Sequence, residues 1–298
     1  MNPYFLIISC AFLFAGQAVF FKIFSSGYFR GLNTYFLNNI FFLGTVVIVC
    51  ALVNGPAGAV NPETYIYAAI FGVLFVFTIL FFITAMTMGP TGLVTLFFSF
   101  GIIIPIIVDL TYLGTLINIF QIVGLVLLFT SFYIGNRPAR EEKKGISVRF
   151  ITVCIASMIL NGAVMAIAKL HQGVMPGTDV HIFAVFSFSV GTLTSAVLFI
   201  IFHIRQARKE KVSYGYMLKT PKYYVSAIGS GVTTAFGNIL MLTIAGLVPA
   251  AVQFPLMNGG TSLITAVLSV FIFKEKFTKK TAIVFVFGIA ALVIINLY

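Results

Sequence analysis

Seven amide side chains inside otherwise apolar segments of this chain are candidates for solute contacts. They are Gln17, Asn38, Asn39, Asn161, Asn238, Gln253 and Asn258. An amide carries donors and an acceptor, and inside hydrocarbon it must pair with protein, with a water-filled cavity or with a bound solute. These amides therefore suit recognition of a polar or zwitterionic solute. The alternative is that they join helices, each contributing about 1 kcal/mol.

Helical spacing places some of these amides on faces with further small or polar residues. The first face holds Gln253, Met257, Gly260 and Thr261, at spacings i, i+4, i+7 and i+8. The second face holds Gly231, Thr234 and Asn238. We expect both faces to line a solute site. Other residues expected to contact the solute are Gln17, Asn38, Asn161, Asn258, Ser99, Phe98 and Tyr35, the last two through their rings.

Four charged residues are candidates for coupling and gating. Asp109 is the one acid well inside an apolar segment, on a stripe with Phe98, Gly101 and Pro105, and is the predicted coupling site. Because it lies about one turn from the end of its segment, an interfacial position is the alternative. The gate candidates are Lys22, Lys169 and Glu275. Their alternatives are snorkelling lysines and a solvated turn around the glutamate.

The sequence offers no catalytic or metal-binding constellation. Its three cysteines stand singly in apolar segments and its three histidines have no partner at ligand spacing, so no metal or other cofactor is expected. It has no GxxxxGK[ST] loop and no paired carboxylates, and an enzyme is not predicted. The formal charge of +11 comes from basic clusters between apolar segments, which argues against nucleic acid as a partner.

The elements that position these residues are continuous apolar segments. Sixty percent of the 298 residues are apolar, 8% are charged and the mean hydropathy is +1.10, as a bilayer requires. Ten segments are long enough to cross the hydrocarbon as helices. They cover residues 4–24, 34–53, 65–87, 91–112, 117–135, 148–168, 181–203, 223–246, 250–273 and 280–297. The predicted fold class is an all-α integral membrane protein with ten transmembrane helices.

The ten helices form two copies of one unit. Gly72, Thr84, Pro90 and Gly101 recur 159 positions later as Gly231, Thr243, Pro249 and Gly260, and Lys22 recurs 147 positions later as Lys169. The predicted organisation is a first repeat at 1–136, a cytoplasmic linker at 137–147 and a second repeat at 148–298. Since five spans is an odd number, the second copy must enter the membrane inverted. This architecture is common in transporters, with the substrate held between the copies.

Basic residues predict the orientation. Of the 18 lysines and arginines, 17 fall in the connections after odd-numbered segments, and the exception is Lys169. Cytoplasmic connections carry the excess of basic residues. We therefore expect a multi-pass protein of the cytoplasmic (inner) membrane with both termini outside.

Several motifs resemble the ten-helix (EamA-like) branch of the drug/metabolite transporter superfamily. They are Gly16 with Lys22, Gly162 with Lys169, Pro249, and the stretch 268–278 that contains Glu275. The resemblance implies that helices three, four, eight and nine line a central cavity and that the protein works by alternating access. It also implies that helices five and ten are peripheral, where they often make homodimer contacts. The pattern departs from the family at Asn38 and Asn39, where an arginine is common, and at Thr115, which aligns with Glu275.

The function predicted from these features is secondary transport of a small polar or zwitterionic metabolite, amino-acid-like or nucleobase-like. The neutral, amide-rich faces favour this solute class. One alternative is export of lipophilic or quaternary cations, with Asp109 and phenylalanine rings as the contacts. The other alternative is a membrane protein that transports no solute.

Overall fold

The computed structural model describes residues 3–53, 61–88, 91–135, 147–175, 180–208, 213–273, 279–295 and 297. Every regular element in these ranges is a helix. The helices are α1 (Pro3–Gly27), α2 (Leu32–Val53), α3 (Glu63–Met88), α4 (Thr91–Phe100), α5 (Ile103–Tyr112), α6 (Ile119–Gly135), α7 (Val148–Val174), α8 (Val180–Ala207), α9 (Gly215–Leu218), α10 (Pro221–Ala245), α11 (Ala250–Phe273) and α12 (Lys279–Ile295).

Six of the described helices are long and apolar enough to cross a membrane, namely α1, α2, α3, α7, α8 and α10. Large apolar side chains also cover the outside, and Leu116 and Val148 are 90% and 81% exposed. Water would disfavour so much exposed apolar surface, whereas lipid accommodates it. The protein is an α-helical, multi-pass membrane protein, as the sequence predicts.

The fourth predicted segment, 91–112, forms two helices, α4 and α5, in place of one continuous helix. Two turn residues, Gly101 and Ile102, separate α4 from α5. Pro105 has no backbone N–H, so it cannot donate to the carbonyl of Gly101 four residues earlier. A Cβ at Gly162 of α7 would lie 2.5 Å from that carbonyl oxygen. The Gly101 carbonyl instead accepts a hydrogen bond from the N–H of Ile104 at 3.1 Å, and it packs against α7.

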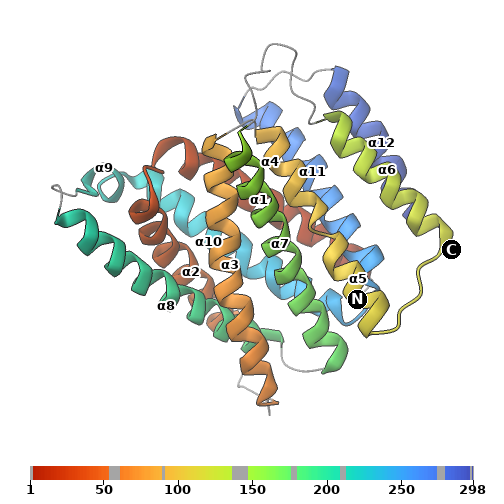
Figure 1. The fold of residues 1–298 in the computed structure, drawn as a ribbon, viewed down its shortest axis with the longest axis horizontal. Coiled ribbons are helices and arrows are strands. Elements are labelled where there is room, and N and C mark those ends of the chain that lie inside the picture. The colour runs from red at the N-terminus through yellow and green to blue at the C-terminus, as the bar shows by residue number, and fades with distance from the viewer. Residues whose placement is uncertain are drawn as a thin grey trace.

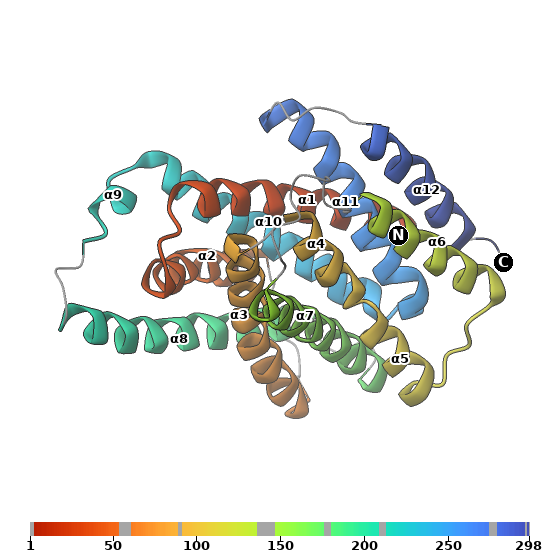
Figure 2. The same ribbon diagram turned by 45° about the horizontal axis from the view of Figure 1, so that its top comes forward.

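The short helix α9 is a second difference, because the sequence predicts only a polar connection between α8 and α10. Figure 1 and Figure 2 show α9 beyond one end of the bundle, while α6 and α12 lie side by side at the opposite edge. The predicted linker at 137–147 falls almost wholly outside the described residues.

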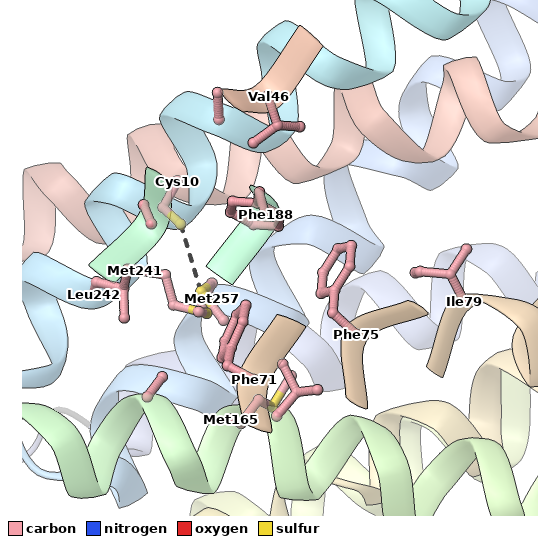
Figure 3. Close-up of a cluster of buried hydrophobic side chains, with 14 of the residues drawn as sticks. Cys10, Val46, Phe71, Phe75, Ile79, Met165, Phe188, Met241, Leu242 and Met257 are labelled. Carbon is pink, nitrogen blue, oxygen red and sulfur yellow. Dashed lines mark hydrogen bonds between the residues drawn. The ribbon is translucent and has the colours of Figure 1, made fainter. Parts of the chain in front are cut away.

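The remaining helices pack in a regular set of pairs. α1 contacts α10 and α11, whereas α7 contacts α3, α4 and α5. α2 contacts α8 and α10, and α8 also contacts α3. Figure 3 shows the centre of this packing, where Cys10, Phe71, Met165 and Met257 belong to one buried apolar cluster. The core thus joins the first half of the chain to the second.

Candidate functional site

The most polar buried contact lies where α10 passes into α11, which we call the hairpin end. Lys169 of α7 places its Nζ 3.7 Å from Asp109 Oδ1 of α5, and the two side chains are only 7% and 2% exposed. A buried charge without a partner is very costly, so each charge depends on the other and on nearby polar groups.

Backbone groups at two helix ends complete the neutralisation of this ion pair. Lys169 Nζ donates to the carbonyl oxygens of Ala245 at 2.9 Å and Val248 at 2.8 Å, at the C-terminal end of α10. Asp109 Oδ2 accepts a hydrogen bond of 2.6 Å from the N–H of Ala250, the first residue of α11. The C-terminus of a helix carries partial negative charge and the N-terminus partial positive charge. Each side chain therefore faces the helix end of opposite sign.

The structure brings together two residues that the sequence analysis selected separately, Asp109 for coupling and Lys169 for gating. It buries Asp109 inside the protein, where the residue is 1% exposed. The signal available in the sequence was that Asp109 is the one acid well inside an apolar segment and that Lys169 is the repeat of Lys22. Their pairing was missed because α5 and α7 meet only in the folded chain.

A second polar layer lies on α10 and α11, one helical turn further from the hairpin end. Gln253 of α11 donates from Nε2 to the carbonyl of Met241 in α10 at 2.7 Å. Its Oε1 is buried without a hydrogen-bond partner among the described residues. An unpaired buried acceptor is costly, and a solute donor would relieve that cost. Gln253 is thus the best-placed of the predicted solute contacts.

Sulfur atoms form the next layer. Cys10 Sγ of α1 donates to the carbonyl of Gly237 at 3.2 Å and lies 3.5 Å from Met257 Sδ of α11. Asn258 Nδ2 lies 3.8 Å from Met165 Sδ of α7. Figure 3 shows the Cys10–Met257 contact as a dashed line. The sequence predicts that Met257 and Asn258 contact a solute. In this packing both contact other side chains of the protein.

The two predicted solute faces pack largely against α1. Gln17 Nε2 donates to Thr234 Oγ1 at 2.6 Å, and Thr261 Oγ1 donates to the carbonyl of Ala11 at 3.4 Å. Asn238 Nδ2 donates within its own helix to the carbonyl of Thr234 at 2.9 Å. α1 therefore lies on both faces in the described conformation, and their contact with a solute stays a prediction.

The other predicted contacts lie in two separate places. Asn161 Nδ2 donates to the carbonyl of Phe98 at 3.0 Å, and the Phe98 ring contacts Phe82. Ser99, next along α4, is half-buried. Tyr35 donates from its hydroxyl to the carbonyl of Val76 at 2.6 Å, and Asn38 is buried on the same helix. These residues are not gathered with Gln253 and Asn238.

The other gate candidates are Lys22 and Glu275. Lys22 is half-buried near the end of α1, where its carbonyl accepts hydrogen bonds from Ser25 and Ser26. Glu275 lies outside the described residues. Within the described ranges, no three histidine, cysteine or acidic side chains gather where they could hold a metal ion.

Sequence reasoning missed a buried polar cluster beside Lys169. His171 places Nε2 3.2 Å from Thr64 Oγ1, while its Nδ1 lies 3.0 Å from Gln172 Nε2. The ring also packs on Phe183 with centroids 4.4 Å apart. This cluster joins α7 to α3 and α8 at the hairpin end.

At the opposite end, aromatic contacts hold α9 against the turn between α1 and α2. The guanidinium carbon of Arg30 lies 3.6 Å from the centroid of the Tyr216 ring, and the Tyr216 hydroxyl donates to the carbonyl of Tyr28 at 3.3 Å. Burial raises the pKa of Tyr216 and the Arg30 charge offsets part of that rise, so the phenol stays protonated. His203 Nδ1 also lies 2.9 Å from the Tyr214 hydroxyl.

Comparison with known proteins places the fold but not the function. No family model matches the chain. No curated protein matches it either. A solved structure described only as "Crystal structure of protein" is 11% identical and has a TM-score of 0.73 over 99% of this chain and 96% of its own length. At this identity the likeness shows a shared fold alone.

Proposed function

We propose that the protein is a secondary transporter that moves a small polar or zwitterionic metabolite across the cytoplasmic membrane by alternating access. It would cross the membrane ten times, as two inverted copies of a five-helix unit. α4 and α5 together make the fourth span, and α9 lies outside the spans. This proposal includes membership of the drug/metabolite transporter superfamily, to which the sequence motifs are similar.

The observation that carries the proposal is that the most extensive helix contacts correspond to one another when the two copies are exchanged. Exchange replaces α1 by α7, α2 by α8, α3 by α10, α4 with α5 by α11, and α6 by α12. The α1–α10 and α1–α11 contacts then become the α7–α3 and α7–α5 contacts, and α2–α10 becomes α8–α3. The α2–α8 and α6–α12 pairs map onto themselves. Such symmetry supports two conformations of similar energy, which alternating access needs.

Close contacts at glycines repeat the same relation at the level of atoms. A Cβ at Gly101 would lie 2.8 Å from the carbonyl of Met158, and a Cβ at Gly260 would lie 3.2 Å from Ala11. Gly260 follows Gly101 by the 159-residue offset, and Met158 follows Ala11 by the 147-residue offset. Both offsets are those of the sequence repeat. The two residues in the second contact are therefore related to the two in the first contact by that repeat.

The solute class follows from the groups that remain available. Asp109 is already paired with Lys169, which leaves less negative charge for a lipophilic cation. The neutral amide of Gln253 retains an unpaired acceptor, which suits an ammonium or hydroxyl donor of a small metabolite. Export of lipophilic cations is therefore the second candidate.

The decisive experiment combines binding and flux. Thermal unfolding of the detergent-purified protein is measured against amino acids, nucleobases and quaternary cations, because a ligand that binds the folded state raises the unfolding temperature with concentration. Each hit is then tested for counterflow in proteoliposomes. We expect polar or zwitterionic hits with counterflow. Hits confined to lipophilic cations would replace the proposal by the second candidate, and the absence of any binding and flux would overturn transport.

A matched pair of variants tests the site. Gln253→Ala should weaken solute binding about tenfold, on the order of one lost hydrogen bond. Gln121→Ala is the control, because Gln121 is also a buried amide but bonds locally to Asn118 before α6. Equal effects of the two variants on solute affinity would remove Gln253 from the site.

A further inference from the structure

We propose that Asp109, Lys169 and Gln253 bind the ammonium and carboxylate groups of an α-amino acid, which places its two charges between those of the buried ion pair. The inference rests on the proposed transport function and deepens it, because it selects one class of zwitterion among small polar metabolites. Asp109 stays ionised and Lys169 stays protonated throughout.

Each charge of the ion pair has one unused position for a hydrogen bond. Asp109 Oδ2 accepts from the N–H of Ala250, whereas Oδ1 is buried without a hydrogen-bond partner among the described residues. The Lys169 ammonium has three N–H groups, and it donates to the carbonyls of Ala245 and Val248. Its Nζ lies 3.7 Å from Asp109 Oδ1, beyond the usual length of a hydrogen bond. An unused acceptor and an unused donor therefore lie side by side.

Gln253 supplies a second unpaired acceptor, Oε1, in the adjacent layer. Its Nε2 donates to the carbonyl of Met241, one helical turn before Ala245. This amide and the Lys169 ammonium therefore bind carbonyls about 6 Å apart along α10. On α11, Gln253 follows the residue bonded to Asp109 by three positions, or about 4.5 Å. One ammonium that donates to both acceptors needs about 2.8 Å to each, which suits this spacing of the layers.

The charges of the ion pair select a zwitterion. The pair is neutral as a whole, and an α-amino acid adds one positive and one negative group on the same carbon. Its ammonium can donate to Asp109 Oδ1 and its carboxylate can accept from Lys169 Nζ, so each buried charge keeps a partner of opposite sign. A lone cation would leave an excess of positive charge. A quaternary ammonium has no N–H and would leave both acceptors unsatisfied.

The position of the cluster suits a site that opens at the hairpin end. Asp109 comes from the first half of the chain, whereas Lys169 comes from the second. The carbonyls that bind Lys169 lie on either side of Gly246 and Leu247, which are both exposed. Movement of this turn would therefore admit a solute to the ion pair, as alternating access requires.

Matched solutes test the chemistry in the unaltered protein. Thermal unfolding of the detergent-purified protein is measured at neutral pH against a panel of L-α-amino acids. Each amino acid that binds is compared with its α-hydroxy acid, its decarboxylated amine and its N-trimethyl betaine. We expect each analogue to bind at least about tenfold more weakly, since each leaves a buried polar group without its partner. An analogue that binds as tightly as its amino acid would overturn the site.

A variant tests Asp109 through the ratio of two affinities. In Asp109→Asn, the affinity for the amino acid should fall at least about tenfold and the affinity for the hydroxy acid should fall less, because only the ammonium needs the carboxylate. A general loss of structure would weaken both solutes equally. Glu63→Gln is the control and should keep the native ratio, since this acid is exposed in the first turn of α3. If Asp109→Asn unfolds the protein, Gln253→Met removes the second acceptor and should lower the same ratio.

The outcomes separate the site from the transport function. Counterflow of nucleobases without any binding of amino acids would overturn the site and leave the transporter in place. A ratio that stays native in Asp109→Asn, or in Gln253→Met where that variant is used, would also overturn the site. Amino acids that bind with the expected ratios but show no counterflow would leave the site in place and overturn the transporter.

Discussion

At the residue scale, the ion pair shows how a charge survives inside this protein. Lys169 is stabilised by two carbonyls and a carboxylate, and Asp109 by an ammonium and a backbone N–H. The stabilisation of each buried charge therefore depends on its sign as well as on its position. An interchange that places lysine at 109 and aspartate at 169 would set each charge against the wrong helix end.

Removal of one partner should cost more than removal of both. We expect Lys169→Met to lower the free energy of unfolding by about 3–5 kcal/mol, because it leaves a buried carboxylate without its counter-charge. The double variant Asp109→Asn, Lys169→Met should be more stable than Lys169→Met alone. Thermal unfolding in detergent gives the comparison, and Lys222→Met, at an exposed position, is the control. Strictly additive losses would show that the two side chains do not interact.

Individual residues were predictable from the sequence only in part. Polar side chains in apolar segments stand out, which is why Asp109 and Gln253 were selected, and Lys169 was selected as the repeat of Lys22. Their partners did not stand out, since four of the five contacts of this cluster and of Gln253 are with backbone atoms of other helices. Backbone groups have no sequence signature, so polar contacts of this kind are invisible before the fold is known.

At the element scale, apolar length fixes the helices and glycine fixes how closely they pack. Continuous apolarity predicted each long helix, because hydrocarbon leaves the backbone no other way to pair its polar groups. It could not predict the four residues of α9, which lie in a polar connection. The break between α4 and α5 needed both a missing N–H at Pro105 and a close approach of α7 to Gly101.

Gly72 gives the sharpest test of close packing. A Cβ there would lie 2.1 Å from the carbonyl oxygen of Ser187 in α8, so Gly72→Ala must push α3 away from α8. We expect a loss of about 1–3 kcal/mol in the free energy of unfolding. Gly44→Ala is the matched control inside α2, because nothing lies within 4 Å of its added Cβ, and it should be neutral or stabilising. Equal stability of the two variants by thermal unfolding would contradict the α3–α8 approach.

At the scale of the whole molecule, helices of the first half of the chain pack against helices of the second half, and each end of the bundle has contacts of different chemistry. Buried charges close the hairpin end, whereas the Arg30–Tyr216 contact and its aromatic neighbours close the α9 end. Asp109 aligns with Leu268 at the 159-residue offset, so the predicted second copy has no acid at the equivalent position. If the chain is duplicated as we propose, residues that differ between the copies give the two ends different contacts.

The sidedness of the two ends follows from charge and can be tested directly. Because 17 of the 18 basic residues fall after odd-numbered segments, the α9 end should be cytoplasmic and the hairpin end outside. Asn61 precedes α3 and Ser213 precedes α9, and both are exposed. In a chain without its native cysteines, Asn61→Cys should react with an impermeant maleimide in intact cells, and Ser213→Cys should react only after the cells are opened. The reverse pattern would invert the molecule in the membrane and place the Asp109–Lys169 pair toward the cytoplasm.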